Sequence, residues 1–233
     1  MVKKYLIFFI VFLSIHGFLY AQKIANKQFS LIQYNLELSK EIRSELDELD
    51  NFISKIKTYN DLGNDKLKAI LVHTIFFTFK EVIERDIELE VLPINTFMNA
   101  VKYDDYGYPK TNIRKALRKG YSQYYFKLDV YIESIDIQQK KDHPKKYEDI
   151  TYKTTYPQVT INMTIYSKDG IIPVYNLIGN ATASNPLQVN KYLLKGFDNT
   201  EMEIAEAGEH QSDNLYTVFY RATKNLIQDY YNK

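Results

Sequence analysis

Two runs of strictly alternating residues constrain the fold of this chain more than any other feature. Apolar and polar residues alternate from Tyr125 to Glu133 and again from Val159 to Tyr166. Since successive side chains of a strand point to opposite faces, each run predicts a strand with one apolar face. Lys168-Asp169-Gly170 predicts a hairpin turn, and residues 172–183 are the expected return strand. The sequence therefore predicts an antiparallel sheet whose apolar face must be covered by other elements.

The apolar positions of the two runs define the expected core. In each run they occupy every second residue, so they share one face of the sheet. The residues predicted to be buried there are Phe126, Leu128, Val130, Ile132, Val159, Ile161, Met163 and Ile165.

Helical periodicity flanks these strands. Apolar residues recur every three or four positions across residues 29–59 and again from Leu67 to Glu84, which predicts two helices that each pack one face on the sheet. The segment before Leu38 has an alternative interpretation as an edge strand. Gln211-Ser212-Asp213 can cap a terminal helix. The apolar stripe of that helix consists of Leu215, Val218, Phe219, Ala222 and Leu226.

Shorter elements are expected in the middle of the chain. Residues 87–92 alternate and end at Pro93, which predicts a short strand. Residues 98–112 form a polar, tyrosine-rich loop, and residues 112–119 form a short basic helix that Gly120 can terminate. A charged connector is expected over residues 138–157.

The N-terminus has the layout of an export signal. Lys3 and Lys4 precede an apolar run from Tyr5 to Leu19, and Ala21 is a small residue at the expected cleavage point. We therefore expect a mature chain that begins at Gln22 and is located in the periplasm or outside the cell. The alternative is an uncleaved anchor, because the apolar run is nearly long enough to span a bilayer. No transmembrane segment is expected after cleavage.

These patterns together predict an α+β fold. The sheet is expected to be antiparallel or mixed, with helices packed on one face and with a long N-terminal and a C-terminal helix. We expect residues 1–21 to be a signal peptide and residues 22–233 to form a single α+β domain. Within that domain, residues 22–60 are the expected helical N-terminal extension and residues 61–233 the expected sheet core.

Composition excludes several classes of protein. The chain has no cysteine, which excludes disulfides, thiolate metal sites and the lipid anchor of a bacterial lipoprotein. Of its 30 basic and 29 acidic residues, the signal segment contains two lysines, so the expected mature chain has 28 basic and 29 acidic residues. A chain so close to neutral has no bulk electrostatic basis for binding nucleic acid or an anionic membrane.

Three segments carry a resemblance to known proteins. They are LKAILVHTIFFTFKEVIERDIELEVLP (67–93), KGYSQYYFKLDVYIESI (119–135) and VTINMTIYSKDGIIPVYNLIG (159–179). In this order of helix, strand and hairpin, the chain resembles the periplasmic α/β domains of bacterial envelope accessory proteins of the curli-secretion and penicillin-binding-protein-activator type. The resemblance implies a non-enzymatic envelope role and carries over no site residues. Residues 22–60 depart from those families, which usually open with a strand.

No catalytic or metal-binding motif stands out. His73, His143 and His210 do not form a ligand pattern, and Asp104-Asp105 lacks the alternating acidic residues of a calcium loop. We therefore expect no cofactor and no metal, and the sequence favours a non-catalytic exported accessory or binding protein. The alternative is a hydrolase acting on envelope polysaccharide or peptide, which needs a cleft with a perturbed acid. The acids considered for that role are Asp104, Asp105, Glu133 and Glu148.

A tyrosine-rich loop followed by a basic helix is the most unusual local feature. Tyrosine brings a large contact area at little cost in side-chain entropy, and arginine adds directional hydrogen bonds. We hypothesise one recognition surface for a protein or glycan of the cell envelope. Alternatively, the tyrosines pack over one end of the sheet and the cations form a solvated helix face. The hypothesised binding residues are Tyr103, Tyr106, Tyr108, Arg114, Lys115, Arg118 and Lys119.

Overall fold

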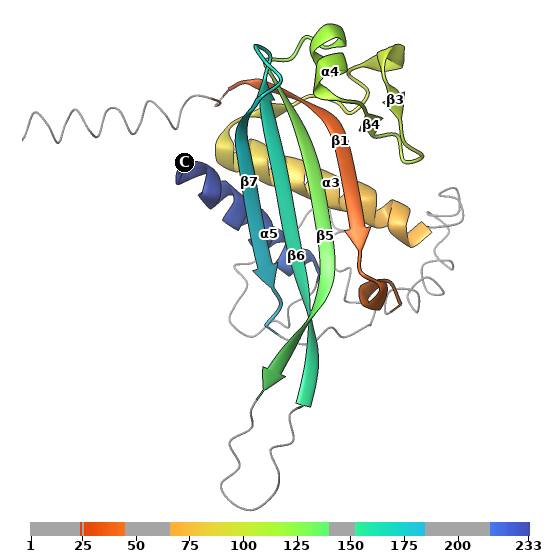
Figure 1. The fold of residues 1–233 in the computed structure, drawn as a ribbon, viewed down its shortest axis with the longest axis vertical. Coiled ribbons are helices and arrows are strands. Elements are labelled where there is room, and N and C mark those ends of the chain that lie inside the picture. Colours follow the sequence, from red (N-terminus) through yellow and green to blue (C-terminus); the bar gives the residue numbers. More distant parts are fainter. Residues whose placement is uncertain (1–23, 25, 45–65, 140–151, 185–214) are drawn as a thin grey trace, which may run out of the picture.

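One five-stranded mixed sheet organises the fold (Figure 1). The computed structural model describes residue 24 and residues 26–44, 66–139, 152–184 and 215–233. The strands lie in the order β2-β1-β5-β6-β7, in which β1 is parallel to both neighbours and the last three form an antiparallel meander. Their bounds are β1 Gln28–Leu38, β2 Glu90–Val91, β5 Tyr124–Gln139, β6 Tyr152–Ser167 and β7 Pro173–Thr182. The predicted α+β class is confirmed.

Helices cover the sheet unequally. Helices α3 (Lys66–Ile87) and α5 (Leu215–Tyr231) pack on one face, behind the sheet in Figure 1. A 3-10 turn, η2 (Met98–Ala100), and a short helix, α4 (Ile113–Lys119), lie at one end of the sheet. A small hairpin of β3 (Lys102–Tyr103) and β4 (Pro109–Lys110) lies beside them. The predicted second helix, basic helix and terminal helix are confirmed.

The predicted core is confirmed in register and in burial. Phe126 pairs with Ile165, Leu128 with Met163, Val130 with Ile161 and Ile132 with Val159. All eight side chains are at most 1% exposed. Because each pair points to the same face, β5 and β6 present one continuous apolar surface to α3 and α5.

The predicted N-terminal helix is wrong for residues 28–38, which form β1, as the alternative interpretation proposed. Before the bulge, the odd-numbered residues Phe29 and Leu31 face the helices. The register shifts between Leu31 and Gln33, so after the bulge the even-numbered residues Tyr34 and Leu36 face them. This bulge inserts one residue into the alternation and produces a three-residue step that looks helical. Residues 40–44 are helical, and residues 45–65 lie outside the described part of the chain.

Other boundaries also differ from expectation. The strand predicted over residues 87–92 is limited to Glu90–Val91, and the predicted loop of residues 98–112 contains η2, β3 and β4. The expected signal peptide, most of the charged connector (140–151) and the segment 185–214 lie outside the described residues.

A second, smaller core lies on the opposite face of the sheet at the α4 end. It consists of Ile32, Phe97, Val101, Ala116, Tyr125 and Tyr166. Gly120 ends α4 as predicted, with its N–H donating to Ala116 O at 2.7 Å, but its φ of −102° does not require glycine. A Cβ at this position would lie 2.7 Å from the Phe97 ring and 2.8 Å from the Tyr125 ring. Glycine is therefore needed here for space.

The outer edge of β7 is covered by side chains of α5. Side chains spaced by four residues along α5, and Lys233 just beyond its end, bond to backbone groups spaced by two residues along β7. The two spacings match because four helical residues rise about 6.0 Å and two strand residues about 6.8 Å. Asp229 accepts from a backbone N–H, and the other three side chains donate to carbonyls. The pairs are Arg221–Thr182, Asn225–Asn180, Asp229–Ile178 and Lys233–Asn176, at 3.1, 2.7 and 3.0 Å for the first three.

Candidate binding site at the β1 edge

The outer edge of β1 is open over most of its length. Strand β2 covers only Gln28 and Phe29, and Thr111 N donates to Ile32 O at 3.0 Å. Ser39 N donates to Ile132 O at 2.9 Å, so the backbone of Ser39 points toward β5. Successive residues of a strand direct their backbone groups to opposite sides, so those of Leu38, Leu36 and Tyr34, after the bulge, point outward. No described residue forms a backbone hydrogen bond with these three positions on the outer side. Unpaired N–H and C=O groups of this kind are a template for another strand.

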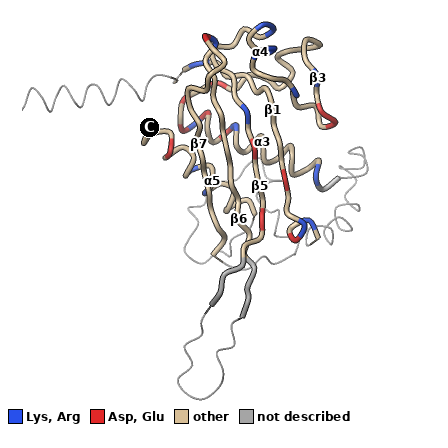
Figure 2. Tube along the Cα trace, viewed as in Figure 1, with Lys and Arg blue, Asp and Glu red and all other residues tan. Residues whose placement is uncertain are grey.

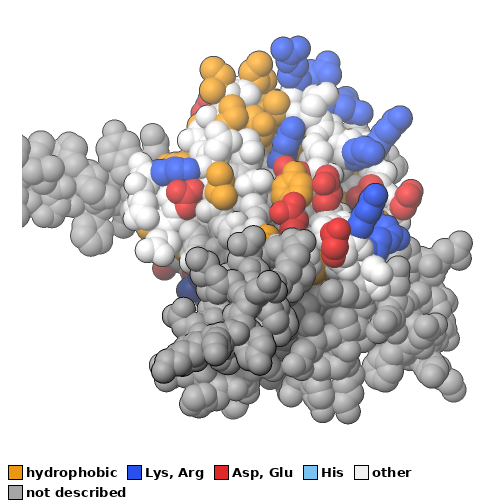
Figure 3. Space-filling view, turned by 60° about the horizontal axis from the view of Figure 1, so that its bottom comes forward, with side chains coloured by type: hydrophobic (Ala, Val, Ile, Leu, Met, Phe, Trp, Pro, Cys, Tyr) orange, Lys and Arg blue, Asp and Glu red, His pale blue; other side chains and the backbone are white. Residues whose placement is uncertain are grey.

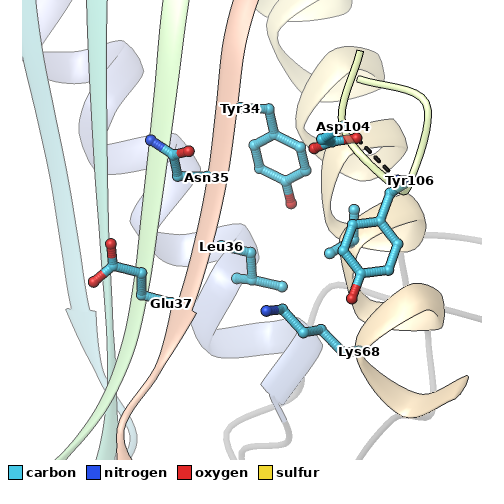
Figure 4. Close-up of a pocket in the computed structure, with 8 residues that line it drawn as sticks. Tyr34, Asn35, Leu36, Glu37, Lys68, Asp104 and Tyr106 are labelled. Atoms are coloured by element: carbon cyan, nitrogen blue, oxygen red, sulfur yellow. Dashed lines mark hydrogen bonds between the residues drawn. The ribbon is translucent and has the colours of Figure 1, made fainter. Parts of the chain in front are cut away.

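A cavity of about 190 Å³ lies beside this open edge (Figure 4). Its walls come from β1, from the start of α3 and from the turn between β3 and β4. We call it the β1-edge pocket. It is lined by Tyr34, Asn35, Leu36, Glu37, Lys68, Val72, Asp104 and Tyr106.

Tyr34 brings a buried polar group to the pocket. Its side chain is 5% exposed, and its hydroxyl has no hydrogen-bond partner among the described residues. Figure 4 shows this hydroxyl directed toward the space between Leu36 and Tyr106. Burial raises the pKa of Tyr34 well above its usual value, and nearby Tyr108 and Asp104 raise it further, so the group is a neutral donor. A ligand that supplied an acceptor would remove an unsatisfied group that costs roughly 1–3 kcal/mol.

Tyr108 forms the inner wall behind Tyr34. It is 0% exposed and makes edge-on ring contacts with Tyr34 and Phe76 at centroid distances of 4.9 and 5.1 Å. Its hydroxyl lies 3.1 Å from Nδ1 of His73 and 3.5 Å from Val72 O. Burial lowers the pKa of His73, and the negative charge of Asp104 acts in the opposite direction on that pKa. These contacts tie the β3–β4 turn to α3.

Asp104 shapes the turn that closes the pocket. Its carboxylate accepts the backbone N–H groups of Tyr106 at 3.0 Å and Tyr108 at 2.8 Å. Gly107 has a φ of +84°, which only glycine adopts at no steric cost. The turn holds the Tyr106 ring 6.0 Å from the Lys68 ammonium, a cation–π distance. The pocket therefore combines apolar walls, one cation and one buried hydroxyl with two acidic residues, Asp104 and Glu37.

The hypothesised recognition residues are distributed over three places. Tyr106 lines the β1-edge pocket, whereas Tyr108 lies in the main core and half-buried Tyr103 packs against the second core. Figure 1 shows the β3–β4 turn extending along β1, away from α4. The cations therefore lie at the end of the sheet, apart from the turn. Arg114, Arg118 and Lys119 are exposed, and Lys115 is half-buried.

Sequence reasoning missed most of the pocket. Tyr34 and Leu36 were expected on a helix, and Lys68 and Val72 carry no local signal. The one available sign was the alternation on both sides of the bulge at Leu31 and Gln33, which identifies a strand but not its exposed edge.

The pocket does not have the arrangement of a two-carboxylate hydrolase. Figure 4 shows the Glu37 carboxylate on the other side of β1 from Asp104, so these two acids do not converge. Within the described ranges, no group of three or more His, Asp or Glu side chains is placed to hold a metal ion. None of the described helices combines the length and apolar composition needed to cross a bilayer.

Comparisons with known proteins give no family for this chain. No family model and no curated protein matches it. A putative neuraminyllactose-binding hemagglutinin homolog from Helicobacter pylori is similar over 69% of this chain and just under two thirds (66%) of its own, with 11% identity and a TM-score of 0.34. A hypothetical protein from Chlamydia trachomatis is similar over 89% of this chain and 97% of its own, with 9% identity and a TM-score of 0.40. At these values neither likeness assigns a function, and the envelope-accessory resemblance stays a prediction.

Proposed function

We propose that this protein is a non-catalytic, exported binding protein that captures an extended segment of a partner protein along the outer edge of β1. The observation that carries the proposal is the contrast between the two edges of the sheet. Side chains of α5 satisfy the β7 edge, whereas the outward backbone groups of Tyr34, Leu36 and Leu38 have no partner among the described residues and lie beside a pocket. Strand addition to an open edge gives affinity through backbone hydrogen bonds and specificity through adjacent pockets.

The pocket suggests which segment would be selected. Leu36 and Val72 supply apolar walls, so an apolar side chain of the added strand would fit there. Lys68 and the Tyr34 hydroxyl favour a carboxylate or carbonyl acceptor close to that side chain. The preferred segment is therefore extended, with an apolar residue followed or preceded by an acidic one.

Export is supported by the N-terminal sequence alone, through Lys3, Lys4 and the apolar run that ends before Ala21. The hydrolase alternative gains no support from the β1-edge pocket, because its two carboxylates lie on opposite sides of β1. A glycan partner is the alternative, which binding to a glycan array tests beside the peptide selection.

The proposal is tested by selecting binders from a phage-displayed random decapeptide library with the chain from Gln22. We expect enriched peptides that alternate apolar and polar residues. Hydrogen exchange with a synthetic copy of one such peptide should protect the amides of Leu36 and Leu38 but not that of Ile178 on the β7 edge. Lys68→Glu should weaken binding at least about tenfold, by loss of an ion pair and gain of a repulsion.

Lys127→Glu is the matched control, since it reverses one charge on the opposite face of the sheet and should leave peptide binding unchanged. Three outcomes would each contradict strand addition. They are a selection that enriches no peptide, protection of the Ile178 amide in place of the Leu36 amide, and binding of glycans without binding of peptides.

A further inference from the structure

Exposed apolar side chains gather at the end of the sheet that carries α4. Met98 is 78% exposed, Ile172 is 79% exposed and Tyr121 is fully exposed. Ile171 and Val174 are also exposed, at about half of their surface. Several large apolar side chains exposed at one end of a fold mark a candidate interaction site. We call this group the end patch: Met98, Tyr121, Ile171, Ile172 and Val174.

Strand pairing places these residues at the same end. Tyr124, at the start of β5, pairs with Ser167 at the end of β6, and Lys168 N donates to Gln123 O at 2.9 Å. Tyr121 comes just before β5, and the turn that contains Ile171 and Ile172 comes just after β6. These residues therefore lie at the same end of the sheet. Met98 follows Phe97, whose ring stacks on Tyr125 at a centroid distance of 6.3 Å.

Basic side chains border the end patch. Arg114, Arg118 and Lys119 of α4 and Lys168 of the β6–β7 turn are exposed, and none of them forms an ion pair within the described part of the chain. Figure 2 shows Lys and Arg residues on α4, and Figure 3 shows a basic group next to an apolar one at the top of the view. The acid of the turn, Asp169, accepts from the Ser167 hydroxyl at 2.9 Å.

We propose that the end patch and its basic border form a docking surface for an anionic lipid bilayer. Transfer of isoleucine and methionine side chains from water to the boundary between headgroups and acyl chains is favourable in free energy, and tyrosine is enriched at that boundary. Each nearby cation adds an attraction to anionic lipid. A nucleic acid would use the cations but would leave the aliphatic side chains in water.

The start of the described chain supports this orientation. Phe29, near the start of β1, pairs with Tyr124, so the N-terminal end of β1 lies at the end-patch side. The apolar run from Tyr5 to Leu19 belongs to the chain that precedes β1. A run that is retained as an anchor would be connected to this end of the fold and not to the opposite one.

The test uses the chain from Gln22, so that residues 1–21 cannot contribute, with folding checked by circular dichroism. It is sedimented with vesicles of pure phosphatidylcholine and with vesicles that contain phosphatidylglycerol at about one lipid in three. We expect co-sedimentation with the anionic vesicles that weakens as salt screens the cations. Arg118→Glu should lower the partition coefficient by about fivefold or more, since each basic residue near such a surface contributes about 1 kcal/mol. Ile171→Ser with Ile172→Ser should lower it at least as much.

Two matched controls separate docking from general effects. Lys40→Glu makes the same change in net charge at the opposite end of β1, and Ile178→Ser removes an equally exposed isoleucine (58%) from the middle of β7. Both should partition as the unchanged protein does. The proposal is overturned if anionic vesicles are not bound, if the controls fall as far as the patch variants, or if the patch variants lose binding only to a DNA or RNA oligonucleotide.

Discussion

At the scale of single residues, tight packing explains positions that sequence reasoning treats as turns or spacers. Gly179 lies in β7 where α5 crosses most closely, and a Cβ there would lie 2.0 Å from Ala222 O and 2.6 Å from Leu226 Cβ. Gly170, in the β6–β7 turn, has nothing closer than 4.0 Å to such an atom. Two glycines nine residues apart therefore have different functions in the fold.

Gly179→Ala should lower the free energy of unfolding by at least about 1–3 kcal/mol, because the helix backbone must move away from the strand. Gly170→Ala is the matched control and should change it by less than about 0.5 kcal/mol. Urea unfolding followed by circular dichroism measures both. Equal stability of the two variants would mean that α5 does not approach β7 so closely.

Tyr34→Phe tests the buried hydroxyl of the β1-edge pocket. Removing an unsatisfied group should raise the free energy of unfolding by up to about 1–3 kcal/mol while it weakens peptide binding. Tyr108→Phe removes a hydroxyl that is bonded to His73 and should instead lower stability by about 0.5–1.5 kcal/mol. Thermal melts beside a binding assay distinguish the two, and a less stable Tyr34→Phe variant would show that the hydroxyl has a partner.

At the scale of elements, the meander was predicted directly, whereas β1 was predicted only as the alternative to a helix. The alternation of β5 and β6 is uninterrupted over the predicted core, and a tight turn joins β6 to β7, so local pattern suffices. β1 contains a bulge, and its partner β5 begins at Tyr124, far along the chain. A parallel pairing of that kind leaves no local sign of which edge stays open.

Leu128→Ala and Ile161→Ala should each lower the free energy of unfolding by about 2–5 kcal/mol, because both side chains are fully buried between the sheet and its helices. Lys127→Ala, on the other face of the same strand, should cost less than about 0.5 kcal/mol. Denaturant titration gives all three values. Comparable losses at Lys127 and Leu128 would contradict the assigned faces of β5.

The α5 side chains that cover β7 should make stability depend on pH. A hydrogen bond from Lys233 lowers the pKa of Asp229, and the N–H of Ile178 also favours the charged form, against an opposing effect of burial. A carboxyl whose folded pKa lies below its ordinary value of 3.8 stabilises the fold above that pH and loses this contribution as the pH falls further.

Asp229→Asn keeps an acceptor for Ile178 but removes the charge. Its melting temperature should therefore fall less than that of the unchanged protein between pH 5 and pH 2.5. Scanning calorimetry at several pH values makes the comparison. An identical acid dependence in the two proteins would exclude Asp229 as a contributor.

At the scale of the whole molecule, the β1-edge pocket brings together β1, α3 and the β3–β4 turn, which no local pattern connects. Tyr106 was identified in advance because the tyrosine-rich loop is unusual in itself, whereas Tyr34 and Lys68 acquire their roles only through tertiary packing. The same packing moves Tyr108 from the hypothesised surface into the core.

Export is a property of the whole chain and remains a prediction. Fractionation of the native host, followed by N-terminal sequencing, should recover the protein outside the cytoplasm with Gln22 as its first residue, because the basic start, the apolar run and Ala21 form a signal-peptide pattern. Recovery of the full-length chain from the cytoplasm would contradict both the location and the proposed envelope role.

The cover of β7 by α5 also has a consequence for the order of events during synthesis. Thr182 and the arginine that bonds to it are separated by 39 residues, so the strand leaves the ribosome well before the helix that protects it. At about 5–20 residues per second this interval lasts roughly 2–8 s. For that time the β7 edge of the sheet is uncovered in addition to the β1 edge, and the newborn chain is more open to pairing with a neighbour than the finished protein is.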